Sequence, residues 1–396
     1  MFALKTLLWS GGGALALAGA LALAHPGHSP LPAPEVSFSA EPQTQTFELF
    51  RGQRIILQGS VNGTATPMML DSGAGATVID RSYADMIGLK GSQSISVRGA
   101  SGDVPAQIAS GVSLSVGGLK LTKLNVLILD MSDVARAIGR PIPVVLGREA
   151  FKAGIVTIDF PGRTIRFADR GRFVAPRQTT RLDVAGDGII PRVKFSVAGL
   201  PPIDADLDIG NGGSVSLAQS YWTGQPALAS LRHAESQSGG VGGLKLARRV
   251  TLPELQFAGM CFQSVPATLN EDPASLPSTG GNIGIELLRA FVVTIDMSGD
   301  VLYLQPTGQT PHFDRERAGV RTELAGNRLK VAYISPDGPA AASGLKAGDE
   351  IAAVDGRLVD ASYYSRPDWT RGDAGRAVSL KRIDGSVVTV TLADYF

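Results

Sequence analysis

The sequence has little of the side-chain chemistry on which many enzymes depend. It holds one cysteine, Cys261, and four histidines among 396 residues. A single cysteine excludes an intrachain disulfide framework and a thiolate metal cluster. Four histidines leave few side chains for zinc sites or for serine–histidine catalysis. We therefore predict no metal site.

Charge is also scarce and nearly balanced. Lys and Arg number 37, Asp and Glu number 36, and the formal net charge is +1. Nucleic acids and anionic membranes are bound through a basic field, which this composition does not provide. We expect no nucleic-acid partner and no bulk membrane insertion of the mature chain.

Apolar residues and glycine are abundant instead. Hydrophobic residues make up 44% of the chain, and glycine occurs 48 times. The length corresponds to two or three domains of about 150 residues each. An excess of glycine with few charges indicates many tight turns, which is typical of β-rich proteins.

Residues 1–24 have the pattern of an export signal. Lys5 precedes a Leu/Ala-rich stretch that ends in Ala22-Leu23-Ala24, a cleavage pattern of small residues. We expect an exported protein in the periplasm or cell envelope, with an uncleaved membrane anchor as the alternative. Prolines without hydrophobic periodicity predict a Pro-rich linker over residues 25–45.

The central part of the chain contains an internal repeat with an offset of 137 residues. Residues 283–299 (IGIELLRAFVVTIDMSG) repeat the pattern of residues 146–162 (LGREAFKAGIVTIDFPG). Separated blocks in one register predict two copies of one unit. The other blocks that share the offset are DSGAG at 71–75 with DIGNG at 208–212, and Ser101-Gly102 with Ser238-Gly239.

Each unit has the pattern of short strands joined by glycine turns. Residues 47–63 (FELFRGQRIILQGSVNG) are rich in β-branched and aromatic residues and end at Asn62-Gly63, a hairpin turn pair. We therefore predict a mainly β fold with two pseudo-symmetric β-barrel lobes, at residues 46–175 and 176–307.

The repeated Asp-x-Gly segment carries the candidate chemistry. Asp71 follows the apolar run PMML, and the glycines after it let the backbone turn and leave the carboxylate uncovered. One such aspartate per repeat predicts that pairing of the units brings Asp71 and Asp208 together. Two carboxylates in contact share a proton, so that one acts as a base on water and the other as an acid.

These motifs resemble a known family. The segment LDSGAGATVI at residues 70–79 resembles the catalytic segment of retropepsin-like and pepsin-like aspartic proteases. Residues 144–147 (VVLG) and 282–284 (NIG) resemble the second signature of that family. The resemblance implies two retropepsin-like lobes, hydrolysis of peptide bonds by water, and no cofactor.

The same resemblance assigns roles to single residues. The catalytic pair is Asp71 and Asp208. The residues that support the dyad are Ser72, Gly73 and Gly210. The candidates for the flaps over the cleft are Gly99, Ser101, Gly102, Ser238 and Gly239.

Two positions of the second repeat depart from the family pattern. Ile209 stands where the family has Thr or Ser, whose hydroxyl hydrogen-bonds across the dyad. Asn282 replaces an apolar residue of the second signature. Two alternatives to an active single-chain enzyme therefore stay open. One is an inactive peptide-binding or scaffold protein, and the other is a homodimer that pairs Asp71 from two chains.

Other polar residues of the repeats are expected to be structural. Glu149 and Glu286 recur beside the second signature, where a cap or ion pair is the simplest role. A serine nucleophile at Ser101 is disfavoured because neither His233 nor His312 has an evident partner.

Residues 316–396 do not repeat the unit. They contain GPA at 338–340, SGL at 343–345 and GDEI at 348–351. In this order the segments resemble the bacterial PDZ domain, a small α+β fold that adds an extended peptide to a sheet edge. The resemblance implies that this domain recruits or regulates a protein substrate through a peptide or C-terminal ligand. It places Ala318, Gly319 and Val320 in the peptide-binding loop and strand.

Overall fold

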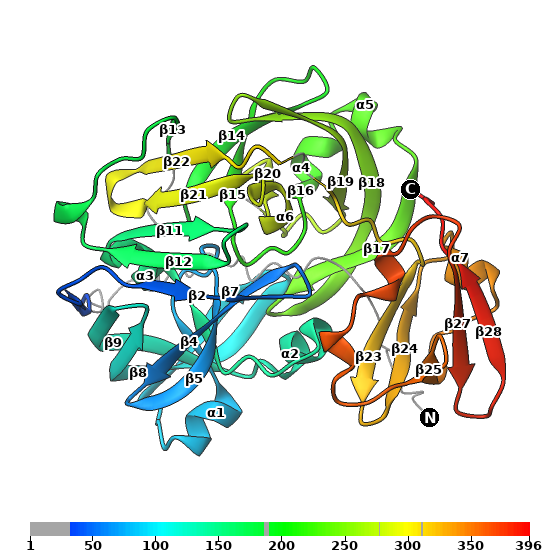
Figure 1. Ribbon diagram of the computed structural model, residues 1–396, viewed down its shortest axis with the longest axis horizontal. Coiled ribbons are helices and arrows are strands. Elements are labelled where there is room, and N and C mark those ends of the chain that lie inside the picture. Colours follow the sequence, from blue (N-terminus) through cyan, green and yellow to red (C-terminus); the bar gives the residue numbers. More distant parts are fainter. Residues whose placement is uncertain (1–31, 186–189, 277, 310–311) are drawn as a thin grey trace, which may run out of the picture.

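The computed structural model describes residues 32–185, 190–276, 278–309 and 312–396. The export signal expected at residues 1–24 and the start of the linker lie outside these ranges. The described chain forms two β lobes and a C-terminal domain, coloured orange to red in Figure 1. The predicted mainly β fold is confirmed. No helix of the described residues is long and apolar enough to cross a membrane.

The first lobe is a small barrel. Its strands are β1 (Glu35–Phe38), β3 (Glu48–Phe50), β4 (Arg54–Val61), β5 (Thr64–Leu70), β6 (Val78–Asp80), β7 (Gln93–Gly99), β8 (Gly102–Val116), β9 (Leu119–Leu129) and β10 (Val144–Leu146). Its helices are α1 (Arg81–Met86), α2 (Ser132–Ile138) and α3 (Arg148–Ala153). The sheet order is β1-β9-β6-β10-β5-β4-β8-β7, with β3 on β4. An additional β8–β9 pairing closes the barrel.

The second lobe repeats this plan. Its strands are β14 (Arg192–Val197), β15 (Ile203–Leu207), β16 (Val215–Leu217), β17 (His233–Gly240), β18 (Gly243–Phe257), β19 (Met260–Asn270) and β20 (Gly281–Ile283). Its helices are α4 (Gln219–Trp222), α5 (Pro226–Ala229) and α6 (Ile285–Leu288). The sheet order is β14-β15-β20-β16-β19-β18-β17, and an additional β14–β18 pairing closes the ring.

A shared sheet joins the lobes. It consists of β2 (Thr44–Thr46), β11 (Ile155–Asp159), β12 (Thr164–Ala168), β13 (Thr180–Asp183), β21 (Phe291–Asp296) and β22 (Val301–Pro306), in the order β13-β22-β21-β11-β12-β2. Thr157 pairs with Thr294, and their hydroxyls lie 3.1 Å apart. Since these threonines are equivalent in the repeat, the pseudo-two-fold axis passes between β11 and β21. Buried apolar residues of both lobes, such as Phe151 and Phe291, form one core.

The C-terminal domain has its own sheet and core. Its strands are β23 (Val320–Ala325), β24 (Arg328–Ile334), β25 (Glu350–Val354), β26 (Arg357–Leu358), β27 (Ala377–Arg382) and β28 (Val387–Thr391). Its short helices are α7 (Pro339–Ala342), η3 (Tyr363–Ser365) and η4 (Trp369–Arg371). The order is β23-β24-β25-β27-β28, with β26 on β25. β23 therefore lies at the edge of the sheet, where it faces α2 of the first lobe (Figure 1).

The linker expected at residues 25–45 needs correction in its second half. β1 pairs with β9, and β2 pairs with β12, so both belong to the folded lobes. Pro34 directly precedes β1 and Pro42 lies between β1 and β2, so neither proline interrupts a strand. These strands are too short to show a clear alternation, which explains why the sequence pattern concealed them.

Candidate active site

A parallel neighbouring strand holds each candidate aspartate in place. β5 pairs with β10, and the backbone N–H of Asp71 donates to the carbonyl of Leu146 at 3.1 Å. In the second lobe β15 pairs with β20, and the N–H of Asp208 donates to the carbonyl of Ile283 at 3.0 Å. Both repeats therefore present one carboxylate at the end of a buried strand in the same way.

The glycines of the second signature allow this arrangement. A Cβ on Gly147 would clash with the carbonyl oxygen of Ala76, and a Cβ on Gly284 would clash with that of Gly213. The loops that carry the aspartates cross the backbone at these two glycines. Any side chain at either position would displace the loop.

The lobes bring Asp71 and Asp208 together within one chain. A Cβ on Gly73 would lie 2.7 Å from Oδ1 of Asp208, and a Cβ on Gly210 would clash with the carboxyl of Asp71. Each loop glycine thus packs directly against the aspartate of the other lobe. Both aspartates are fully buried in this conformation.

Ser72 connects the two aspartate loops. Its hydroxyl donates to the carbonyl of Leu207 at 2.7 Å and accepts the N–H of Ile209 at 2.9 Å. Ile209, the equivalent residue of the second repeat, is fully buried and contributes only apolar contact from its side chain. A single hydroxyl therefore makes two hydrogen bonds between the lobes from one side of the pseudo-two-fold axis.

The two carboxylates have different hydrogen-bond partners. Oδ1 of Asp71 accepts the N–H of Gly73 at 2.8 Å, whereas its Oδ2 accepts no N–H or O–H in the described part of the chain. Asp208 accepts the N–H of Asn211 at 3.0 Å and the side-chain amide of Asn282 at 2.7 Å. Asn282 is therefore a direct partner of the pair. The sequence marked it only as a departure from the family pattern.

Burial raises the pKa of both carboxyls. For Asp71, burial raises the pKa most, and the charge of Asp208 raises it further. Burial also raises the pKa of Asp208, but the hydrogen bond from Asn282 and the charge of Arg54 oppose this rise. Carboxyls in contact titrate as a pair. The surroundings favour the proton on Asp71 and the negative charge on Asp208.

A buried arginine lies beside the pair. Arg54 begins β4, is 4% exposed, and packs so closely on the loop after β15 that a Cβ on Gly212 would clash with its guanidinium. Its charge lowers the pKa of both aspartates, and burial lowers the pKa of Arg54 itself to about 10. Arg54 is thus cationic at neutral pH. Arg54 was not predicted as a site residue from the sequence. The available signal was a charged residue at the start of an apolar strand. The equivalent position of the second repeat is Pro191, so this charge is not shared by the two repeats.

Glu149 and Glu286 have diverged. Oε2 of Glu149 accepts the N–H and the hydroxyl of Thr77 at 2.8 and 2.9 Å, so it braces the first aspartate loop. Glu286 accepts the N–H of Asp314 at 3.1 Å and lies 3.6 Å from Arg371 of the C-terminal domain. The contacts fit a structural role for both, but Glu286 connects the second lobe to the C-terminal domain.

Two glycine hairpins, one from each lobe, touch at their tips. The β7–β8 hairpin turns between Gly99 and Gly102, and the N–H of Ser101 at its tip donates to the carbonyl of Val241 at 3.2 Å. Val241 lies at the tip of the β17–β18 hairpin and packs into an apolar cluster of the first lobe. The candidate flap residues of the first repeat therefore lie where the two hairpins meet.

The second hairpin corrects the expected register. Gly240 and Gly243 form its turn pair, and they follow Gly99 and Gly102 by 141 residues, not 137. Ser238 and Gly239 consequently lie in β17, just before the tip. The second lobe has α4 and α5 before its hairpin, and the first lobe has α2 after its hairpin. The offset therefore returns to 137 at β20.

The structure gives Ser101 no histidine partner among the described residues. The hydroxyl of Ser101 is buried without a hydrogen bond there. His233 lies at the opposite end of β17 from the hairpin tip, and His312 lies 3.6 Å from Asp314. No group of three or more His, Cys, Asp or Glu residues within the described ranges could hold a metal ion.

The PDZ candidates lie at the start of β23. Ala318, Gly319 and Val320 are all buried. The N–H groups of Ala318 and Gly319 donate to the side chain of Glu316. These three residues lie at a sheet edge, but the N–H groups of Ala318 and Gly319 are already engaged by Glu316.

Comparison with known proteins identifies two parts of the chain. The family model described as aspartyl protease matches residues 57–150, and the one described as PDZ domain matches residues 317–392. The chain carries an aspartyl protease domain and a PDZ domain. Both resemblances stated from the sequence are confirmed. The aspartyl protease match contains Asp71 and Gly147.

A curated protein is similar over a smaller part of the chain. It is described as a probable periplasmic serine endoprotease DegP-like from Halomonas elongata. The two are 43% identical over 133 residues, which covers 30% of this chain and 27% of that protein. The chain therefore spans about a quarter of the length of this relative, whose printed description names a different catalytic type.

Proposed function

We propose that the chain is an exported aspartic endopeptidase that hydrolyses peptide bonds with Asp71, Asp208 and a water molecule. The observation that carries this proposal is the contact between the two aspartate loops of one chain. Each loop glycine, Gly73 or Gly210, lies against the aspartate of the opposite lobe. The aspartyl protease match to the first lobe supports the same reading.

The surroundings of the carboxyls support distinct roles. Asp208, which accepts from Asn282, takes a proton from water as the water oxygen bonds to the scissile carbonyl carbon. Asp71 donates its proton to the carbonyl oxygen, which gives a neutral diol. The diol then collapses. The C–N bond breaks, the amine takes the proton from Asp208, and Asp71 recovers its proton from a hydroxyl.

An aspartic mechanism fits the described residues better than a serine mechanism. A serine mechanism is named in the description of the relative from Halomonas elongata, and the match covers only 27% of that protein's length. Ser101 lies in a glycine hairpin and meets the opposite hairpin, away from His233. The contact between Asp71 and Asp208 within one chain also favours a single-chain site over a homodimeric one.

Protein or peptide is the substrate class that both domains support. A PDZ domain adds an extended peptide to its sheet edge, and a two-lobed protease holds an extended chain between its lobes. The proposed role of the PDZ domain is therefore to recruit or regulate a protein substrate. Export is supported by the pattern of residues 1–24 and by the periplasmic description of the relative.

A cleavage assay tests the proposal. The purified full-length chain is incubated with a diverse peptide library, and products are identified by mass spectrometry. We expect cleavage that falls about a thousandfold or more in both Asp71→Asn and Asp208→Asn. A statine-containing peptide should block it, and a serine-directed phosphonofluoridate should not. Asp204→Asn is the matched control, since Asp204 is exposed and pairs with Lys194 at 2.7 Å.

Other results would overturn the proposal in identifiable ways. Inactivation by the serine reagent would reject the aspartic mechanism. Peptide binding without any cleavage would favour the inactive binding protein. Cleavage that survives Asp208→Asn but not Asp71→Asn would favour a homodimer that pairs Asp71 from two chains.

A further inference from the structure

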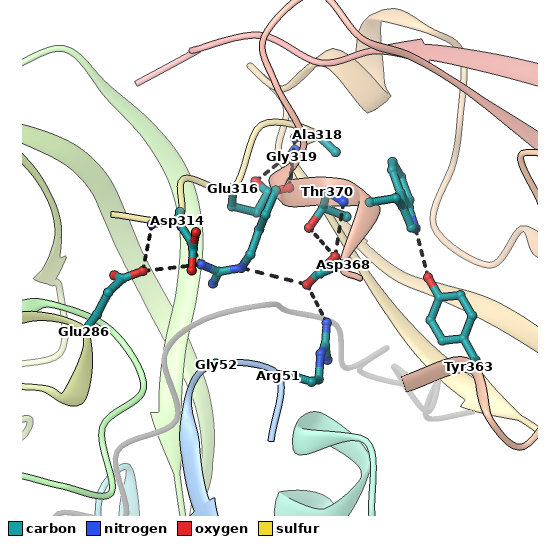
Figure 2. Close-up of polar contacts among 12 residues, drawn as sticks. Arg51, Gly52, Glu286, Asp314, Glu316, Ala318, Gly319, Tyr363, Asp368 and Thr370 are labelled. Atoms are coloured by element: carbon teal, nitrogen blue, oxygen red, sulfur yellow. Dashed lines mark hydrogen bonds and ion pairs between the residues drawn. The ribbon is translucent and has the colours of Figure 1, made fainter. Parts of the chain in front are cut away.

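The ligand loop of the PDZ domain holds a carboxylate of the chain itself. The N–H groups of Ala318 and Gly319 donate to Oε1 of Glu316 at 2.9 and 3.0 Å. The hydroxyl of Tyr395 donates to Oε2 of the same side chain at 2.5 Å. Figure 2 shows Glu316 turned onto this loop. The terminal carboxylate of a peptide ligand would need the same N–H groups, so the loop is occupied in this conformation.

The edge that would receive a peptide is occupied as well. The hydroxyl of Tyr364 donates to the carbonyl of Thr322 at 3.3 Å and accepts the N–H of Leu324 at 3.2 Å. These are backbone groups of β23, the edge strand, and an added strand would bond to them. The ring of Tyr364 also packs on Gly139, which ends α2 of the first lobe. One tyrosine thus fills the edge and ties it to the protease.

Charged side chains around this edge fasten the PDZ domain to both lobes. Asp368 forms an ion pair with Arg51 of the first lobe at 2.6 Å, and the guanidinium of Arg51 lies 4.8 Å from the ring centre of Tyr364. Arg371 lies 3.8 Å from Asp368 and 3.6 Å from Glu286 of the second lobe. The PDZ domain therefore spans the junction between the lobes.

The PDZ domain also holds the strand that leads to the second hairpin. The hydroxyl of Tyr333 donates to Glu235 at 2.9 Å, and Tyr395 and Phe396 pack against Ala234. Glu235 and Ala234 belong to β17, whose far end carries the hairpin tip that meets the first lobe. These contacts tie the PDZ domain to the strand that carries the second hairpin.

We propose that the PDZ domain is a clamp that holds the two hairpins together, and that an extended peptide with a free terminal carboxylate releases it. Such a peptide takes the N–H groups held by Glu316 and the edge held by Tyr364. A ligand shifts a conformational equilibrium by its preference for one state, and this peptide binds only the released domain. The gain in cleavage rests on the proposed function, whereas hairpin opening is measurable without catalysis.

Hydrogen exchange of the full chain tests the clamp directly. Tyr364→Phe keeps the ring and removes both bonds to β23, and Tyr333→Phe removes the hydrogen bond to Glu235 of β17. For each variant we expect exchange in residues 97–103 and 233–243 to be faster by at least about fivefold, the factor that one lost hydrogen bond predicts. Tyr303→Phe, in β22 of the shared sheet, is the matched control and should leave the exchange of both hairpins unchanged.

A peptide arm tests the ligand class. A decapeptide library with free carboxylates is added to the full chain, in parallel with the same library in amidated form. We expect the free-carboxylate library to speed hairpin exchange and cleavage of an amidated reporter by at least about fivefold. Tyr364→Phe should reach the same effect at about one fifth of the peptide concentration.

The outcomes separate this inference from the proposed function. Unchanged hairpin exchange in both tyrosine variants overturns the clamp, even if the wild type cleaves peptides. Faster exchange without cleavage under any condition supports the clamp and overturns the peptidase. Equal effects of the free and amidated libraries overturn the carboxylate as the releasing group.

Discussion

Replacing Ser72 with alanine tests the contact between the two aspartate loops. The hydroxyl bonds to the carbonyl of Leu207 at 2.7 Å and to the N–H of Ile209 at 2.9 Å, and Ser72 is fully buried. In Ser72→Ala both backbone groups lose this partner at a buried interface, and each loss costs about 1–3 kcal/mol. We expect the free energy of unfolding of the lobes to fall by about 3–4 kcal/mol, since the side chain of Ile209 has no polar group to compensate.

Urea denaturation followed by hydrogen-exchange mass spectrometry reports the lobes separately from the PDZ domain. With a urea dependence of about 2 kcal/mol per molar, the lobe midpoint should fall by about 1.5–2 M. Ser72→Thr keeps the hydroxyl and should stay within about 1.5 kcal/mol of the wild type. Ser94→Ala removes a hydroxyl at an exposed position of β7 as the matched control. A lobe midpoint for Ser72→Ala no lower than that of Ser94→Ala would refute the reasoning.

Three further changes test the electrostatics and packing of the site. Arg54→Gln removes a cation that lowers the pKa of both aspartates, so the pH profile of kcat/KM should move to higher pH, and a profile that stays in place contradicts this role. Burial raises the pKa of Asp206 to about 6, so its contribution to stability is present below about pH 4 and is lost as the pH rises through 6. In urea titrations, the free energy of unfolding of Asp206→Asn should therefore rise by about 2–3 kcal/mol relative to that of the wild type as the pH is raised from about 3.5 to about 8. A difference between the two proteins that does not change with pH would count against this role of Asp206. Gly210→Ala drives a methyl group into the carboxyl of Asp71 and should lower kcat/KM at least about a hundredfold, while Gly224→Ala, at an exposed turn, leaves it unchanged.

The sequence predicts those parts of the site that depend on a local pattern. Asp71 and Asp208 were predicted as a pair because a strand, an aspartate and a glycine recur in one register. Asn282 and Arg54 were not found as site residues, because each reaches the pair from another strand and its role depends on which strands become neighbours. Periodicity carries no information about such long-range contacts.

The flaps and the PDZ domain show a second limit of the sequence pattern. The register of 137 residues fails between α1 and β20, because helices of different length precede and follow the two hairpins. The PDZ motifs identified the domain, but they gave no sign that Tyr364 fills its edge. That contact depends on the tertiary packing of Tyr364 between β23 and Gly139 at the end of α2.

The two repeats differ at the residue after the aspartate, which is Ser72 in the first repeat and Ile209 in the second. In the sequence, Ile209 was the main argument for a lost activity, because it removes a hydroxyl that the family places across the dyad. In the structure, the hydroxyl of Ser72 alone makes both bonds between the loops, and Ile209 contributes its N–H and a fully buried side chain. The loops are therefore held without a second hydroxyl, and the second repeat adds Asn282 on Asp208 instead. With Ile209 in place the pair stays buried, in contact and hydrogen-bonded, because Ser72 and Asn282 supply the bonds. Ile209 therefore does not argue against the proposed catalysis.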